Sequence, residues 1–254
     1  MLLGKKEKET FDALGFFHLS GFLNSTLLEE LKKEVDCYIK DKVPFLDAVD
    51  AFYDNPEKPE TLKQLHRMEQ DPFFAQYRQH PYWNNVASTM LGEPVAKVQG
   101  VELFNKPPNT LHETPPHQDN YYFCLEPPSV LTIWVALDPV DEKTGCIRYA
   151  SGSHRQGLRP HRPSSSLGFS QYIPDYSQND RKTEEKILAD PGDALIHHGN
   201  TIHRAEPNLS RNRHRKAFAM VFRGLSARRD ETRYQSYQTS SNRQQASLGI
   251  DMKF

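Results

Sequence analysis

The sequence has few cysteines, and they are not arranged for cross-linking. Its 254 residues include 3 cysteines, Cys37, Cys124 and Cys146, with no Cys-x-x-Cys pair among them. An odd number without such a pair argues against a disulfide framework and against a thiolate zinc site. We therefore expect a reducing, cytoplasmic location.

Long apolar runs are also scarce. The most apolar stretch, residues 130–137, is interrupted by Thr132 and is far shorter than the ~20 residues that a membrane-spanning helix needs. The opening MLLGKKEKE has no apolar core behind a basic head, so it does not resemble a secretory signal. We expect a soluble protein that does not bind membranes.

Neither sign of charge is in excess. Lys and Arg number 32 and Asp and Glu 33, which gives a formal net charge of −1. Proteins that bind nucleic acids neutralise phosphates with a surplus of basic side chains. The balance predicts a small-molecule partner and no nucleic acid, and it predicts nothing about the oligomeric state.

What the sequence does contain is a series of short β-type runs between residues 95 and 225. Runs such as VAKVQGVELF, VLTIWVALD and KAFAMVFRG are separated by turn sequences such as KPPN and DPGD. Many short strands with no regular helix between them predict a sandwich or a jelly-roll barrel. All-β domains of this length routinely form one unit, so we expect a single domain over residues 1–254.

The segments outside this β-rich part have other patterns. Residues 1–94 carry the helical signal, because Thr26-x-x-Glu29 resembles a capping box that opens an amphipathic helix. The run FFHLSGFL, just before it, has the alternation of a short strand. Residues 226–254 are polar and predict a surface strap or a frayed end.

Residues 159–185 are too long for a tight hairpin loop, and loops of that length are usually functional or disordered. We interpret them as a lid or a substrate-recognition insertion. Side chains here and around residue 122 suggest a pocket with aromatic walls and a cationic rim, and a solvated loop explains the insertion equally well. These side chains are Tyr121, Tyr122, Phe123, Tyr172, Tyr176, Arg159, His161 and Arg162.

The segment PPHQDNYYF contains the sharpest local feature. Residues two apart on a strand point the same way, so His117 and Asp119 can present an imidazole and a carboxylate to one ion. With one distant histidine they form the facial triad of non-haem iron oxygenases. A His-x-Asp pair alone is weak evidence, because it occurs by chance in many chains.

A second histidine-rich segment, DPGDALIHHGNTIHRAEPN, offers the distant ligand. It places His197, His198 and His203 on or just after an apolar strand. For His197 and His198 we favour core histidines that are hydrogen-bonded to backbone. We expect His203 to be the metal ligand because of the arginine that follows it.

Arg215 follows His203 by 12 residues and opens the alternating run KAFAMVFRG. Its guanidinium is expected to project from the next strand into the cavity that holds the metal. A 2-oxoglutarate molecule that chelates iron through its keto acid end leaves a second carboxylate, which a planar guanidinium binds bidentately. Arg211, Arg213 and His214 compete for this role, and their other interpretation is a solvated basic turn.

These motifs together resemble those of the phytanoyl-CoA dioxygenase family of iron(II)- and 2-oxoglutarate-dependent oxygenases. The resemblance runs from FDALGFFHLSGFLNSTLLEEL through FNKPP, HQDNYYF, IWVALDPVDEKTGCIRYASGSHRQG and GDALIHHGNTIHRAEPNLS to RKAFAMVF. It implies a mainly β fold with flanking α-helices around a double-stranded β-helix, the jelly-roll or cupin-like core.

The resemblance also implies a site and a reaction. It places iron(II) on His117, Asp119 and His203 and the distal carboxylate of 2-oxoglutarate on Arg215. The implied reaction consumes 2-oxoglutarate and O₂, releases succinate and CO₂, and hydroxylates or otherwise oxidises an unactivated C–H bond of a small organic molecule. The carboxylate of Asp119 favours oxygenation over halogenation, because halogenating relatives replace it with a small residue.

Further co-substrate contacts follow from the same resemblance. The aromatic residue on the strand after the His-x-Asp motif is Trp134, whose other interpretation is a core tryptophan. Thr132 shares the face of Trp134 and carries a hydroxyl that can donate. Arg67 is the basic residue ahead of the barrel. Lys106 fits the end of a strand before a proline turn better than a ligand.

Two other classes of protein remain as alternatives. The first is a non-catalytic metal-binding β-barrel that serves as a sensor or binding module, and the intact set of three ligands plus arginine counts against it. The second is a zinc hydrolase with two histidines and one acid. It lacks a clear general base near the His-x-Asp motif and leaves Arg215 unexplained.

Overall fold

The fold is built from two antiparallel β-sheets that face each other. The computed structural model describes residues 3–165 and 168–249. Within these residues, the larger sheet has the order β1 (Phe16–Leu19), β12 (Ala194–His198), β7 (Val130–Ala136), β14 (Arg215–Gly224), β4 (Val95–Lys106), β3 (Leu62–Leu65) and β2 (Ala51–Tyr53). The smaller sheet has the order β11 (Glu184–Ile187), β8 (Ile147–Ala150), β13 (His203–Ala205) and β5 (Thr114–His117).

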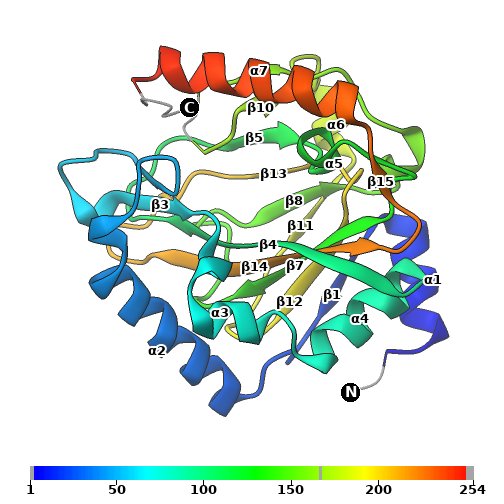
Figure 1. The fold of residues 1–254 in the computed structure, drawn as a ribbon, viewed down its shortest axis with the longest axis horizontal. Coiled ribbons are helices and arrows are strands. Elements are labelled where there is room, and N and C mark those ends of the chain that lie inside the picture. Colours follow the sequence, from blue (N-terminus) through cyan, green and yellow to red (C-terminus); the bar gives the residue numbers. More distant parts are fainter. Residues whose placement is uncertain (1–2, 166–167, 250–254) are drawn as a thin grey trace.

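Figure 1 shows the smaller sheet above the larger one, with helices below and above the pair. The helices are α1 (Lys5–Leu14), α2 (Ser25–Asp41), α3 (Pro72–Tyr77), α4 (Pro81–Leu91), α5 (Asn120–Phe123), α6 (Gln178–Lys182) and α7 (Glu231–Ser247). The 3-10 helices are η1 (Val43–Phe45), η2 (Pro59–Thr61), η3 (Met68–Gln70) and η4 (Ser153–Gln156). Two short strand pairs join β9 (Arg162–Pro163) to β10 (Gln171–Tyr172) and β6 (Leu125–Glu126) to β15 (Arg228–Arg229). The predicted mainly β fold with flanking helices and a jelly-roll core is confirmed.

The larger sheet has two faces with different tasks, because side chains alternate along each strand. In β7, Ile133 and Val135 point outward into an apolar cluster with the helices, and Phe218 of β14 joins them there. Thr132 and Trp134 of β7 point inward, toward the smaller sheet, and line a cavity. The outer face therefore builds the larger apolar cluster, and the inner face combines a second apolar cluster with the cavity.

The N-terminal segment confirms its predicted helix and strand but contains more than helices. Helix α2 begins two residues earlier than expected: the side chain of Asn24, and not that of Thr26, accepts the capping hydrogen bond from the Leu27 amide at 3.0 Å. The predicted strand is β1, which pairs with β12 at the edge of the larger sheet. Strands β2 and β3 extend the opposite edge of the same sheet. The residues of α2 that pack on the core are Leu28, Leu31, Val35 and Tyr38.

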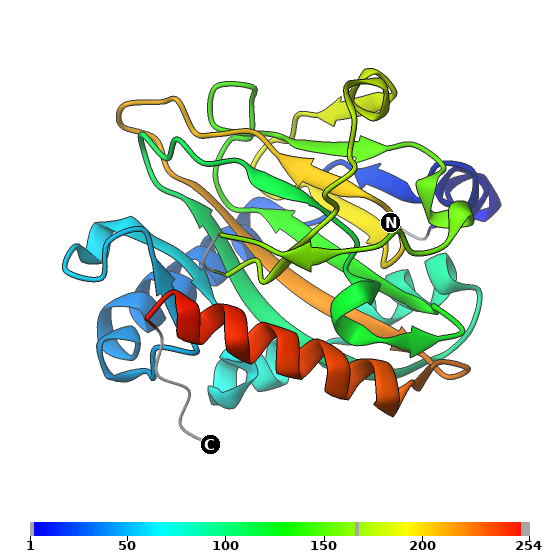
Figure 2. The ribbon, with the colours of Figure 1, turned by 90° about the horizontal axis from the view of Figure 1, so that it is seen from above.

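The C-terminal segment differs from its prediction. It forms the helix α7 and no frayed end up to residue 249, and Figure 2 shows this helix crossing in front of the two sheets. The side chain of Asp230 caps it by accepting from the Arg233 amide at 3.0 Å. Gln244 is buried and donates to the Ser164 carbonyl at 3.0 Å. Polar composition concealed this helix because its buried face is itself polar; residues 250–254 lie outside the described residues.

The insertion over residues 159–185 is folded where the structure describes it, and residues 166–167 of it lie outside the described residues. It contains β9, β10 and α6. The Ile173 amide donates to the Pro116 carbonyl at 2.8 Å, which ties the insertion to β5. Its role as a lid stays a prediction. Across residues 3–165 and 168–249, no helix combines the length and the apolar character needed to span a membrane.

Candidate active site

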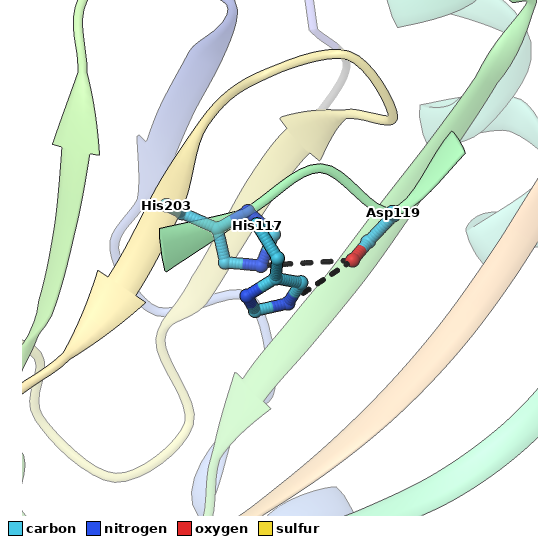
Figure 3. A group of neighbouring side chains, drawn as sticks. All are labelled: His117, Asp119 and His203. Carbon is cyan, nitrogen blue, oxygen red and sulfur yellow. Dashed lines mark ion pairs between the residues drawn. The ribbon is translucent and has the colours of Figure 1, made fainter. Parts of the chain in front are cut away.

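Three metal-binding side chains converge at the rim where the two sheets meet. His117 is the last residue of β5, Asp119 follows it by two residues, and His203 opens β13. One ligand atom from each lies within 4.8 Å of the others. The Nε2 atoms of both histidines are 3.6 Å from Oδ1 of Asp119, as the dashed lines in Figure 3 show. The two histidines and the acid that the sequence predicted therefore come together.

The route by which they converge differs from the expected one. His117 and Asp119 do not share a strand face, because β5 ends at His117 and Asp119 has the helical dihedrals φ −58° and ψ −37° at the start of α5. The turn after the strand brings the carboxylate back toward the imidazole. His203 is brought in by strand pairing, since it lies directly opposite His117 in the register of β13 and β5.

Backbone carbonyls set the tautomers of both histidines. Nδ1 of His117 lies 2.8 Å from the Pro115 carbonyl, and Nδ1 of His203 lies 3.0 Å from the Thr201 carbonyl. A carbonyl only accepts, so each Nδ1 carries the proton and donates it. Each Nε2 is left with a free lone pair on the side that faces Asp119, which is the arrangement found in metal-ligating histidines. These donors fit a divalent iron ion.

The second carboxylate oxygen of Asp119 is held by the larger sheet. Oδ2 accepts from the hydroxyl of Thr132 at 2.7 Å and lies 3.1 Å from Nε2 of His197. Nδ1 of His197 is 3.0 Å from the hydroxyl of Tyr149, which lets Tyr149 donate to His197 and His197 donate to Asp119. Oδ1 is thereby left to a metal. The expectation that His197 bonds to backbone is wrong, whereas His198 does accept from a backbone amide, that of Asn200 at 3.0 Å.

Burial sets the protonation states of the cluster. It lowers the pKa of His117, and with the neighbouring histidines it lowers the pKa of His203 well below its usual value. Burial alone would raise the pKa of Asp119, but the histidines around it reverse this and hold that pKa below its usual value. Neutral imidazoles and an ionised carboxylate are the forms that bind metal ions.

The cluster opens into a cavity of about 410 Å³ between the sheets. Arg215 lies on its wall and is 4% exposed, and its side chain has no hydrogen bond or ion pair to any residue that the structure describes. Its Nε is buried without a partner, and its guanidinium lies 5.3 Å from the ring centre of Trp134. Burial lowers the pKa of Arg215 to about 10. A buried cation without a counter-ion is costly, so this end of the cavity is suited to a bound carboxylate.

Two neighbouring cations clarify the role of Arg215. Lys106 lies opposite it in the register of β4 and β14 and is also buried, with Nζ donating to the His112 carbonyl at 3.2 Å. Lys106 does end its strand, as expected, and burial together with the charge of Arg215 lowers the pKa of its amine well below the usual value. Arg213 is bound to Asp141 at 2.7 Å and is partly exposed, away from the cavity. Arg215 is thus the arginine that reaches the cavity.

The family model of phytanoyl-CoA dioxygenase (PhyH) matches residues 11–217. The chain belongs to this family. It is therefore an oxidoreductase, a 2-oxoglutarate-dependent dioxygenase that works with iron. The expectation drawn from the sequence motifs is confirmed.

Individual relatives agree with this membership. A phytanoyl-CoA dioxygenase of Arabidopsis thaliana is 26% identical over 84% of this chain and 88% of its own length. A 1-deoxypentalenic acid 11-beta-hydroxylase of Streptomyces exfoliatus is 31% identical over 52% of this chain and 50% of its own length. Among solved structures, EvdO2 from Micromonospora carbonacea var. aurantiaca, complexed with 2-oxoglutarate, has a TM-score of 0.71 at 22% identity over 89% of this chain and 93% of that one. This last likeness concerns the fold.

The remaining predicted residues of this PhyH member all line the cavity, but in different surroundings. Trp134 faces Arg215, and Thr132 directs its hydroxyl to Asp119. Arg67 is bound to Asp50, with Nη2 2.7 Å from Oδ2, and its side chain is half exposed at the rim. Its expected contact with the co-substrate stays a prediction.

The expected aromatic pocket is built partly from other residues than those expected. Tyr122 and Phe123 line the cavity, whereas the other aromatic and cationic side chains predicted for it do not. Arg159, for example, is occupied by ion pairs with Asp175 and Asp180. Residues that sequence reasoning missed complete the walls, namely His66, Glu69, Glu102, Phe104, Phe169, His197, Arg229, Tyr234 and Tyr237. Only the alternation of β4 signalled any of them, by placing Glu102 and Phe104 on one face.

Removing one ligand should remove the metal. We expect His203→Ala to abolish binding of Mn(II) or Fe(II) measured anaerobically by calorimetry, because only Asp119 and His117 would remain. His198→Ala should bind metal as the natural chain does, since His198 is bonded to backbone. If His198→Ala loses the metal and His203→Ala keeps it, the ligand set is misassigned.

His197 offers a graded test of how Asp119 is held. His197→Phe keeps a ring in place but removes the hydrogen bond to Oδ2, and loss of such a supporting bond typically weakens metal binding by about 10–100-fold. His197→Gln, which can still donate, should recover part of the loss. Equal metal affinity in His197→Phe and the natural chain would show that Thr132 alone holds the carboxylate.

Proposed function

We propose that this dioxygenase hydroxylates, or otherwise oxidises, an unactivated C–H bond of a small organic molecule. In this proposal iron(II) is held by His117, Asp119 and His203, and the distal carboxylate of 2-oxoglutarate by Arg215. When bound, iron and 2-oxoglutarate supply the oxidising chemistry with O₂, and succinate and CO₂ leave. The supporting observation is that one cavity contains both the three-ligand cluster and a buried guanidinium without a partner.

The residues of the chain have separate tasks in this proposal. His117, Asp119 and His203 would hold the iron and would leave room for other ligands on it. Trp134, whose ring lies 5.3 Å from the guanidinium of Arg215, would line the part of the cavity that holds 2-oxoglutarate. The cavity keeps water from the reacting C–H bond, which limits side reactions.

The alternatives explain fewer of these features. A sensor or binding module that only holds a metal has no need for a buried, unpaired arginine facing the same cavity. A zinc hydrolase leaves the same guanidinium without a task. Asp119 favours oxygenation over halogenation, because its carboxylate occupies the position that a halide takes in halogenating relatives.

The setting of the enzyme is also proposed. The substrate is a small molecule, in line with the family, and the balanced charge argues against nucleic acid. A reducing cytoplasm is supported by the cysteines, which are all unpaired, with Cys124 and Cys146 buried as thiols.

Arg215 provides the test of this function. Deleting one partner of a buried charge-assisted pair costs about 3–5 kcal/mol, because the other charge is left uncompensated. At ~1.4 kcal/mol per decade, Arg215→Ala should weaken 2-oxoglutarate binding to the metal-loaded protein by roughly 10²–10³-fold. Arg215→Lys should be intermediate, because it keeps the charge but loses the planar fork.

The matched control is Arg213→Ala, which removes an arginine two residues away that is paired with Asp141. It should leave the dissociation constant of 2-oxoglutarate nearly unchanged, and both Arg215 variants should still bind metal. A larger effect from Arg213→Ala than from Arg215→Ala would contradict the assignment.

A further inference from the structure

The cavity continues well beyond the metal cluster, and its far wall carries an acid that the proposed reaction does not use. Glu102 of β4 lies opposite Ala219 of β14, which in turn lies opposite Trp134 of β7. Glu102 and Trp134 are thus two strands apart on the inner face of the larger sheet. Neighbouring strands are ~4.8 Å apart, so Glu102 lies roughly 10 Å to the side of the strand that carries Trp134 and Thr132.

Glu102 differs from the other charged residues on this wall. Glu69 accepts from the Val101 amide at 3.0 Å and lies 4.0 Å from Arg78. Arg67 is bound to Asp50. Glu102 lines the cavity, and its side chain makes no hydrogen bond or ion pair among residues 3–165 and 168–249. Its carboxylate is therefore directed to the cavity without a partner.

The surroundings make this lack of a partner costly. Burial raises the pKa of Glu102, the nearby His66 acts in the opposite direction, and the negative charges of Asp119 and Glu69 raise the pKa further. A partly buried carboxylate in such surroundings is stabilised most by a positively charged ligand that binds beside it.

The aromatic lining of the cavity suits a cation with an apolar body. Tyr122, Phe169 and Tyr237 line the cavity; the rings of Tyr122 and Phe169 lie 5.8 and 5.3 Å from that of His117, and the rings of Tyr122 and Tyr237 are 5.6 Å apart. The faces of aromatic rings attract cations. The guanidinium of Arg229 stacks on Tyr234 at 4.0 Å and comes from β15, which pairs with β6 and not with β4. Among the described residues, Arg229 forms no ion pair with Glu102.

We propose that Glu102 binds a protonated amine of the substrate, so that the substrates of this enzyme are aliphatic or cyclic amines. This inference rests on the proposed function. The amine would lie on the order of 10 Å from the strand that supports the metal ligand Asp119, given the spacing of strands.

The test compares three matched probes: hexylamine, hexan-1-ol and hexanoate. The full chain is loaded with Mn(II) and 2-oxoglutarate under argon, which occupies the Arg215 end of the cavity without turnover, and probe binding is measured by equilibrium dialysis. We expect hexylamine to bind at least ~10-fold more tightly than hexan-1-ol, with hexanoate weakest, since a charge-assisted bond to a partly buried carboxylate exceeds a neutral one.

Variants of two acids on the same wall separate Glu102 from general charge. Glu102→Gln should abolish the preference for the amine, and Glu102→Lys should reverse it in favour of hexanoate. Glu69→Gln is the matched control and should keep the preference, because Glu69 is already engaged by Arg78 and the Val101 amide.

The outcomes separate this inference from the proposed function. If the chain takes up Mn(II) and 2-oxoglutarate but binds the three probes equally, binds hexanoate best or binds none, the amine proposal is wrong and the dioxygenase proposal stands. A preference for hexylamine that survives in Glu102→Gln also overturns it. If Mn(II) and 2-oxoglutarate do not bind, the proposed function fails and this inference fails with it.

Discussion

The carboxylate of Asp119 interacts with side chains from both sheets. The smaller sheet supplies His117 and His203, which face Oδ1, and the larger sheet supplies Thr132 and His197, which hold Oδ2. With Oδ2 occupied twice, Oδ1 alone is available to a metal. The geometry of the site therefore depends on how the two sheets are packed, and not only on the three ligand residues.

The division between the two faces of the larger sheet explains how a buried cavity survives inside a packed domain. Apolar side chains on the outer face pack with α2, α3 and α4 in the larger core cluster, and a second apolar cluster fills part of the space between the two sheets. The inner face can then carry groups that are costly to bury, namely Arg215 and Glu102. Each lacks a protein partner, and they lie on different rows of the sheet. A co-substrate carboxylate at one and a substrate amine at the other would neutralise both.

Much of this arrangement was predictable from local patterns. The strand alternation of KAFAMVFRG predicted Arg215 on the cavity side, and the His-x-Asp pair, the arginine that follows His203 and the family resemblance together indicated the ligand set. The turn that brings Asp119 back to His117 was not predictable, because a His-x-Asp pair has the same sequence whether it lies within a strand or at the end of one. The structure shows that the pair spans the end of β5 and the start of α5.

Other features depend on contacts between distant segments, which no local pattern reports. His197 meets Asp119 across 78 residues, and its neighbour His198, with the same sequence surroundings, does not. The residues that α7 buries are the polar Ser241 and Gln244. The sequence of the tail therefore lacks the apolar stripe that would have predicted this helix. Glu102 is distinguished by its lack of a partner, which depends on the contacts of Arg67 and Glu69 with distant residues.

The most direct measurement of the central claim is an anaerobic titration of the natural chain with iron(II) and then 2-oxoglutarate, followed by visible absorption and calorimetry. The account predicts stoichiometric binding of both and a weak charge-transfer band that appears only when protein, iron and 2-oxoglutarate are all present. Binding of 2-oxoglutarate that is the same with and without metal, and no such band, would contradict it.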